Sequence, residues 1–248
     1  MGNNYFRFKR FTVFQDNVSM RVNTDGVLLG AWFSLPFANP SVLDVGTGTG
    51  VVALMAAQRI SGTGSSDFSV EAIEIDSSSS VQAQKNFSAS EWKRNLLVYN
   101  ADFRTFADYS GPKYNIIVSN PPYFINSLKN PSETKRNARH TDKLPYEDLV
   151  INSRRLLLEG GVLSLILPPE EQAAFNTVAE SYGFIGKRMC RVYSRRGDTM
   201  PIRIMAEYVS TPSEKTEASV SEDLFILDSD SGYTEEYKAL TRDFYLKF

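Results

Sequence analysis

The stretch Val42-Leu43-Asp44-Val45-Gly46-Thr47-Gly48-Thr49-Gly50 decides the fold of this 248-residue chain. Its apolar first part predicts a buried strand over 41–45, and the glycines predict a tight turn. Helical composition follows over 51–60. A strand, a glycine turn and a helix in this order are typical of an α/β sheet that binds a ligand at the turn.

The spacing of the three glycines is G-x-G-x-G, which differs from the G-x-G-x-x-G of dinucleotide sites. Glu74 ends the next predicted strand, where a carboxylate can accept both hydroxyls of a ribose. Asp102 follows the third strand and is placed to accept from an adenine amino group. With Asp44, these positions predict a nucleoside site without a pyrophosphate. The plainer alternatives are a solvated strand end for Glu74, a turn cap for Asp102 and a backbone partner for Asp44.

A second motif, Asn120-Pro121-Pro122-Tyr123, follows the apolar run 116–119. It puts an amide at the carboxyl end of a predicted strand, where open α/β sheets bind ligands. The prolines remove two backbone donors and leave their carbonyls as acceptors, and an aromatic ring follows. Such a pocket suits a planar molecule with an exocyclic NH2, such as adenine. The alternative is a proline-rich turn, and the glycine loop upstream favours the pocket.

Strands and helices alternate along the chain, which predicts a doubly wound, mostly parallel sheet in a single domain. A final antiparallel pair, 184–193 and 202–209, surrounds Arg195 and Arg196. The other predicted strands are 41–45, 70–75, 96–99, 114–119 and 162–167, and the predicted helices are 26–33, 51–60, 77–90, 146–158, 169–182 and 234–246.

Composition excludes several classes of chemistry. Cys190 is the lone cysteine, so we expect neither an internal disulfide nor a cysteine zinc site. His140 is the lone histidine, which argues against two-histidine metal sites and Ser-His-Asp catalysis. We therefore expect no metal. The apolar runs are too short to cross a bilayer and the N-terminus lacks a signal region, so we expect a cytoplasmic protein without membrane contact.

Charge is unevenly distributed, although the net charge is only −2. Three stretches are rich in Lys and Arg, and the chain after Glu207 is acidic. Basic surfaces of this kind can hold a polyanion on one face. Ordinary solvated charge is the alternative for each stretch alone. The basic stretches are 1–21, 129–143 and 185–203.

The motifs in this order resemble the class I S-adenosylmethionine-dependent methyltransferases. Asn120–Tyr123 is similar to the subset that methylates amino groups, which includes adenine-N6, guanine-N2 and glutamine-N5 enzymes. Phe8–Asn17 and Met20–Trp32 resemble the bacterial tRNA1(Val) (adenine-N6)-methyltransferase family, and Tyr233–Leu246 is similar to the end of that family's sequences. The resemblance covers nearly the whole chain, and the extra Gly/Ser-rich stretch 61–68 leaves the motifs intact.

This resemblance implies methylation of the adenine N6 directly 3′ of the anticodon in a valine tRNA, with S-adenosylmethionine as cofactor. It implies a Rossmann-like α/β fold: a mostly parallel seven-stranded sheet with an antiparallel edge strand and helices on both faces. Residues 1–248 would form one domain, and an N-terminal extension over about 1–40 would close over the cofactor. A monomer is expected.

Carried over position by position, the resemblance assigns roles to single residues. Asn120, Pro121 and Tyr123 would form the target pocket. Thr24 and Asp25 would close over the methionine moiety. The positions expected at the cofactor are Thr24, Asp25, Asp44, Gly46, Gly48, Gly50, Glu74, Asp102 and Asn120.

The expected chemistry needs no strong base. Carbonyl oxygens of Asn120 and Pro121 would accept the hydrogens of the target amine, and Tyr123 would stack on the base. The long polar segment 124–145 and the turn between the last two strands supply candidate RNA contacts, with a solvated loop as the alternative. These candidates are Arg136, Arg139, His140, Arg195 and Arg196.

Three rival functions stay open at this point. The first is another amino-group methyltransferase, acting on rRNA, DNA or a protein glutamine. The second is a nucleoside-binding or RNA-binding module without catalysis, which the intact motifs disfavour. The third is an NAD-dependent oxidoreductase, which needs room for a pyrophosphate that the glycine spacing does not indicate.

Overall fold

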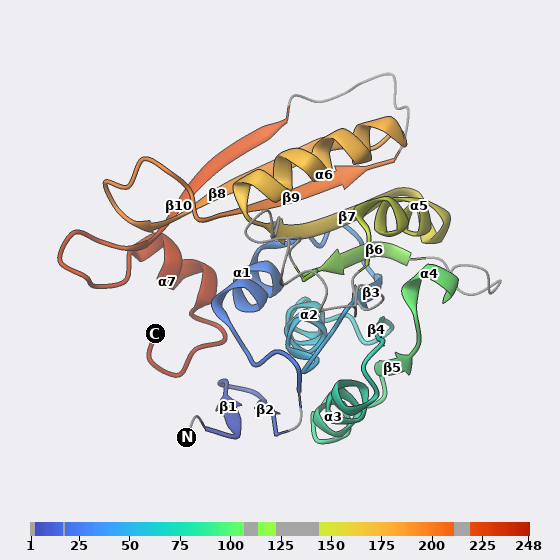
Figure 1. The fold of residues 1–248 in the computed structure, drawn as a ribbon. Helices are drawn as coiled ribbons and strands as arrows, with labels where there is room; N and C mark the ends of the chain where they lie inside the picture. Colours follow the sequence, from blue (N-terminus) through green and yellow to red (C-terminus); the bar gives the residue numbers. More distant parts are fainter. Residues whose placement is uncertain (1–2, 17, 107–113, 123–143, 211–218) are drawn as a thin grey trace, which may run out of the picture.

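The computed structural model describes residues 3–16, 18–106, 114–122, 144–210 and 219–248. An eight-stranded sheet crosses the molecule and a two-stranded hairpin lies near the N-terminus (Figure 1). The hairpin pairs β1 (Tyr5–Arg7) with β2 (Thr12–Phe14). The strand order in the large sheet is β10-β8-β9-β7-β6-β3-β4-β5.

Five neighbouring strands of the large sheet, from β7 to β5 in that order, run parallel. β9 runs antiparallel to both of its neighbours, β7 and β8, and β10 is parallel to β8. The bounds are β3 (Ser41–Val45), β4 (Ser69–Glu74), β5 (Leu96–Asn100), β6 (Tyr114–Ser119), β7 (Leu157–Leu167), β8 (Ile185–Arg195), β9 (Arg203–Val209) and β10 (Val220–Leu227).

Helices cover both faces of this sheet, because successive strand residues point to opposite sides. On β3, Val42 packs into a core with α1, α2 and α3, whereas Leu43 packs into a second core with α5 and α6. No helix within the described ranges has the length and apolarity to cross a membrane. The helices are α1 (Thr24–Trp32), α2 (Val51–Gly62), α3 (Ser77–Ser88), α4 (Phe103–Phe106), α5 (Tyr146–Leu156), α6 (Pro169–Ser181) and α7 (Glu235–Thr241).

The predicted fold class is confirmed, with two differences in detail. Within the described residues the sheet has eight strands, one more than predicted, and the additional strand is β10. The antiparallel strand β9 lies inside the sheet and not at its edge, because β8 pairs with its outer side. β10 is held to β8 partly by ion pairs, Arg188 with Glu222 and Arg191 with Asp223, and such long-range partners leave no local sequence pattern.

The strand order reverses next to β3. β4 lies on one side of it and β6 on the other, so the helices that follow β3 and β6 leave in opposite directions. In open α/β sheets this switch point opens a crevice beyond the carboxyl ends of the strands. The segments that end β3, β4, β5 and β6 are therefore where a ligand site is expected.

Candidate functional site

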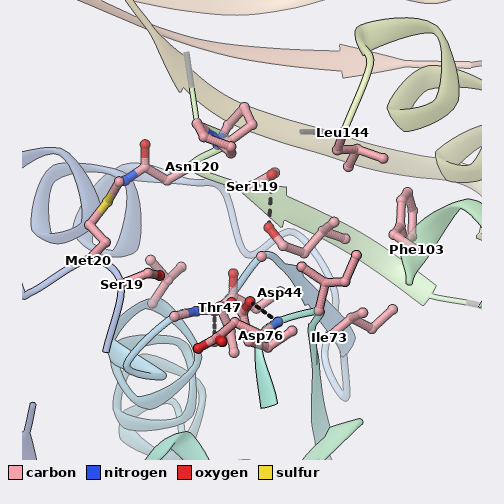
Figure 2. Close-up of a pocket in the computed structure, with 18 of the residues that line it drawn as sticks. Ser19, Met20, Asp44, Thr47, Ile73, Asp76, Phe103, Ser119, Asn120 and Leu144 are labelled. Atoms are coloured by element: carbon pink, nitrogen blue, oxygen red, sulfur yellow. Dashed lines mark hydrogen bonds between the residues drawn. The ribbon is translucent and has the colours of Figure 1, made fainter. Parts of the chain in front are cut away.

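A cavity of about 680 Å³ lies at the carboxyl ends of β3, β4, β5 and β6. Its walls come from the glycine loop after β3, the ends of the other three strands, and the segment before α1. Figure 2 shows Asn120 and Met20 on one side of this space and Phe103 and Leu144 on the other. The cavity thus joins both sequence motifs in one site.

The glycine loop presents two of its glycines to the cavity. Gly46 has φ +74° and Gly48 has φ +56°, and no atom lies within 4 Å of a Cβ built on either residue. Gly50 also has a left-handed φ, +83°, but it does not line the cavity. A Cβ there would lie 2.5 Å from a ring carbon of Phe87 on α3. Gly46 and Gly48 therefore leave room for a ligand, whereas Gly50 leaves room for α3.

Asp44 stabilises the glycine loop through hydrogen bonds. It is buried, and its Oδ2 accepts hydrogen bonds from the Thr47 hydroxyl at 2.6 Å and the Ala53 backbone N–H at 3.2 Å. Figure 2 labels Asp44 and Thr47 on the wall of the cavity. Burial raises the pKa of Asp44 to about 7, because a low-dielectric environment disfavours the charged form. Asp44 thus links the loop to the first turn of α2, and it also lines the cavity.

Glu74 is the last residue of β4, and Asp76 lies two residues further along the chain. Glu74 accepts from the backbone N–H groups of Gly48 at 2.8 Å and Asp76 at 2.9 Å, and burial raises its pKa. Asp76 caps α3 through Ser79, and hydrogen bonds from Ser79 and Ser78 lower its pKa. Each carboxylate oxygen has capacity for further hydrogen bonds. The pair can therefore accept hydroxyl groups of a ligand in the cavity.

The end of β5 combines a carboxylate with apolar walls. Asp102 lines the cavity, as the sequence predicts, but its carboxylate is engaged by Arg104, whose Nε lies 2.8 Å from Oδ2. The hydrogen bonds from Arg104 lower the pKa of Asp102. Phe103 and Leu144 add apolar surface to the same end. Sequence reasoning missed Phe103, although an aromatic residue directly after Asp102 was an available signal.

Asn120 follows β6 at the opposite side of the cavity. The Ser119 hydroxyl donates to the Val45 carbonyl at 2.9 Å and thereby ties the ends of β6 and β3 together (Figure 2). Asn120 and Pro121 both line the cavity, half-buried and buried respectively. Within the described part of the chain, no group hydrogen-bonds to the Asn120 amide. Tyr123 lies outside the described residues.

The segment before α1 forms a further wall, through residues that sequence reasoning did not select. Thr24 and Asp25 do not line the cavity. Asp25 instead forms an ion pair with Arg203 on β9, at 2.9 Å. The residues of this segment that do line it are Ser19, Met20, Arg21 and Asn23, and Gly26 in the first turn of α1 lines it as well.

Asn86 on α3 joins this N-terminal part to the glycine loop. Its amide NH2 donates to the carbonyls of Phe14 at 2.9 Å and Thr49 at 2.8 Å, and its oxygen accepts from the Phe14 N–H. The side chain is 1% exposed. The hairpin and the glycine loop therefore share one buried hydrogen-bonding partner, which a lone Asn in a polar helix does not reveal from sequence.

The candidate RNA contacts fall into two groups. Arg136, Arg139 and His140 lie outside the described residues. Arg195 and Arg196 lie at the turn between β8 and β9. The start of β9 pairs with the carboxyl end of β7, so this turn lies at the same end of the strands as the cavity. Arg196 is ion-paired with Asp228 and Glu236, and Arg195 donates to a backbone carbonyl.

Comparisons with known proteins agree with this architecture. Residues 27–183 match the family described as methyltransferase small domain. The tRNA1(Val) (adenine(37)-N6)-methyltransferase of Parabacteroides distasonis is 43% identical over 248 residues, which is 100% of both chains.

Two solved structures share the fold. A predicted O-methyltransferase from Agrobacterium tumefaciens aligns with a TM-score of 0.66 and 18% identity, over 89% of this chain and 96% of that one. A Listeria monocytogenes protein assigned to the class I S-adenosylmethionine-dependent methyltransferases aligns with a TM-score of 0.56 and 12% identity, over 88% and 65%.

Proposed function

The chain belongs to the family of bacterial tRNA1(Val) (adenine(37)-N6)-methyltransferases, and we therefore propose that it methylates the N6 atom of adenine 37 in a valine tRNA. The observation that carries this proposal is the shared cavity, in which Asn120 and Pro121 lie with the glycine loop and Glu74. A pocket for an amino group and a pocket for a nucleoside are thus combined.

The cavity has the features that S-adenosylmethionine requires. When bound, this cofactor supplies a methyl group on a positively charged sulfur. The open space above Gly46 and Gly48 lets a ligand approach the loop backbone closely, and Glu74 with Asp76 can accept the ribose hydroxyls. Phe103 provides an apolar wall for the adenine ring. Asp102 would meet the adenine amino group while it stays paired with Arg104.

Asn120 and Pro121 would act on the target amine. An adenine amine is a poor nucleophile because its lone pair is delocalised into the ring. The side-chain carbonyl of Asn120 and the backbone carbonyl of Pro121 accept its two hydrogens and favour a more pyramidal, electron-rich nitrogen. Holding this nitrogen in line with the methyl donor then lowers the barrier through positioning. Water takes the surplus proton, so no strong base is needed.

The target base is expected to leave its stack before it reacts. Bases of an anticodon loop are single-stranded, so extruding one costs less than extruding a base from a duplex. Tyr123 would stack on the extruded base, a contact worth roughly 1–3 kcal/mol. This role stays a prediction from the sequence.

We also propose that residues 1–248 act as one domain, with the segment before α1 closing over the cofactor. Ser19, Met20 and Asn23 already line the cavity, which supports this role. We also propose that the protein acts as a monomer. A tRNA substrate also implies the cytoplasm as its location.

The test is methyl transfer by the purified protein with labelled S-adenosylmethionine. The substrates are a valine tRNA transcript, the same transcript with guanine 3′ of the anticodon, bulk tRNA lacking valine tRNA, DNA and a release factor. We expect label in the first transcript alone. Equal label in the guanine transcript would exclude the adenine as target, and label in the release factor would support a glutamine methyltransferase instead.

A further inference from the structure

The cavity assigned to the cofactor is lined by four carboxylates: Asp44, Glu74, Asp76 and Asp102. These suit the hydroxyls, the ammonium group and the sulfonium of S-adenosylmethionine. They do not suit its α-carboxylate, because a carboxylate moved out of water next to like charges is costly unless a cation pairs with it. The cavity therefore needs a cation at the position of that carboxylate.

Two cationic side chains, Arg21 and Arg104, line the cavity among the described residues. Arg104 is engaged by Asp102 through its guanidinium fork. It also lies next to Phe103, at the end of the cavity where the adenine ring is expected. Arg104 is therefore unsuited to the amino-acid end of the cofactor.

Arg21 differs in both respects. It is exposed on the rim of the cavity, and no described group forms a hydrogen bond or ion pair with its guanidinium. The backbone on either side of it is fixed, because Val22 N–H donates to Gln15 at 3.0 Å and Ser19 N–H donates to Ser79 at 3.3 Å. The backbone that bears Arg21 is thus held in place, while the Arg21 side chain itself is exposed.

The first turn of α1 adds positive potential at the same corner. Asn23 caps this helix by accepting from Gly26 N–H, and both residues line the cavity. A helix N-terminus attracts anions through its dipole and its unpaired N–H groups. Asp25, the acid of this turn, is held by Arg203 in an ion pair that offsets its charge.

The orientation of the cofactor follows from the other contacts. Glu74 ends β4, which lies between β3 and β5 in the sheet. Phe103 and Leu144 lie on the side of the cavity opposite Met20 (Figure 2). With the ribose at Glu74 and the adenine at Phe103, the amino-acid end of the cofactor points to the side of Met20 and Arg21.

We propose that Arg21 binds the α-carboxylate of S-adenosylmethionine and so fixes the amino-acid end of the cofactor. The inference rests on the proposed methyl-transfer function and adds a binding residue to it. The same pairing would hold S-adenosylhomocysteine after the reaction, since that product keeps the carboxylate.

The test compares two ligands by isothermal titration without tRNA. One is S-adenosylhomocysteine, and the other is S-adenosyl-3-thiopropylamine, which keeps the amine and lacks only the carboxylate. Arg21→Ala should weaken the first by roughly 10- to 100-fold, as expected for a charge-assisted hydrogen-bonded pair. It should leave the second within about twofold. Arg21→Lys should fall between wild type and Arg21→Ala for S-adenosylhomocysteine.

Arg94→Ala is the matched control, because Arg94 is an exposed arginine that does not line the cavity. An equal loss for both ligands in Arg21→Ala would mean a structural role and would overturn the inference. Unchanged binding of both ligands, with weaker tRNA binding, would make Arg21 an RNA contact instead. If wild type bound S-adenosylhomocysteine but methylated no tRNA, the substrate proposal would fail while this inference stood.

Discussion

At the scale of single residues, the partners of each polar side chain decide whether that side chain reaches the cavity. Asn120 and Glu74 line the cavity, as expected from their positions at strand ends. Asp25 does not, because Arg203, far away in sequence, draws it into an ion pair. A motif fixes which backbone reaches the site. The contacts that each side chain then makes depend on residues outside the motif, as Arg203 shows for Asp25.

Asn120→Ala is expected to lower the rate of methyl transfer by roughly 10³-fold, the scale seen when one transition-state hydrogen bond is removed. Affinity for S-adenosylhomocysteine should stay within about twofold, because the proposed partner of Asn120 is the target amine. Single-turnover assays and titration measure the two quantities. Near-normal turnover in a folded variant would remove Asn120 from the pocket.

Asp44 should make stability depend on pH. Its pKa is about 7 in the folded protein and 3.8 as the ordinary value. The folded state therefore keeps a proton that the unfolded chain loses, and stability falls as pH rises from about 4 to about 7, by up to about 4 kcal/mol. Both hydrogen bonds of Asp44 reach the same oxygen, so Asp44→Asn can keep them.

The measurement for Asp44 is urea unfolding of wild type and Asp44→Asn between pH 5 and 8. We expect Asp44→Asn to gain stability relative to wild type as pH rises, with the gain levelling off above pH 7. A difference that does not change with pH would contradict the raised pKa.

At the scale of elements, the buried strands were predictable and the exposed edge strand β10 was not. β6 is apolar and bounded by turn residues, and its predicted bounds agree with the structure. β10 is mostly exposed or half-buried and carries two adjacent acids, Glu222 and Asp223, in its first half, a composition that does not favour a strand. Its pairing depends on arginines of β8, which local periodicity cannot report.

Substitutions in the glycine loop should separate packing from binding. Gly50→Ala should destabilise the protein by roughly 2–5 kcal/mol, because φ is +83° and the new methyl group would meet Phe87. Gly48→Ala has only the strain of its φ, roughly 1–2 kcal/mol, since no atom surrounds its Cβ position. Its methyl group should instead enter the cofactor space and weaken binding by roughly tenfold or more.

Chemical denaturation and titration with S-adenosylhomocysteine measure both effects. Gly62→Ala is the control: Gly62 ends α2 without a left-handed φ, and a Cβ there meets no neighbour within 4 Å. It should leave binding unchanged. If Gly48→Ala bound the ligand like wild type, the loop would not face the cofactor.

At the scale of the whole molecule, ion pairs with distant acids offset much of the positive charge in 185–203. Four of the six basic residues in 185–203 form ion pairs with acids. These acids come from α1, β10 and the start of α7, so a local count overestimates the basic surface. The segment 129–143 has five basic residues against two acids, and it begins six positions after Tyr123 of the target motif.

Arg136→Ala combined with Arg139→Ala should therefore weaken tRNA binding and flatten its dependence on salt. Each lost phosphate contact lowers the slope of log K against log salt by roughly 0.7–0.9. Arg196→Ala is the comparison, because Arg196 is paired with Asp228 and Glu236 before any RNA binds, and its effect should be smaller. An unchanged slope in the double variant would exclude the segment from the RNA contact surface.

The buried amide of Asn86 couples the N-terminal hairpin to the glycine loop. Because the same amide NH2 donates to the carbonyls of both Phe14 and Thr49, detaching the hairpin would remove one of the bonds that orient this amide towards the loop. By thermodynamic linkage, a ligand at the loop stabilises the docked hairpin by as much free energy as the docked hairpin adds to the binding of that ligand. Binding of the cofactor would then protect the N-terminus from proteolysis, away from the site of methyl transfer.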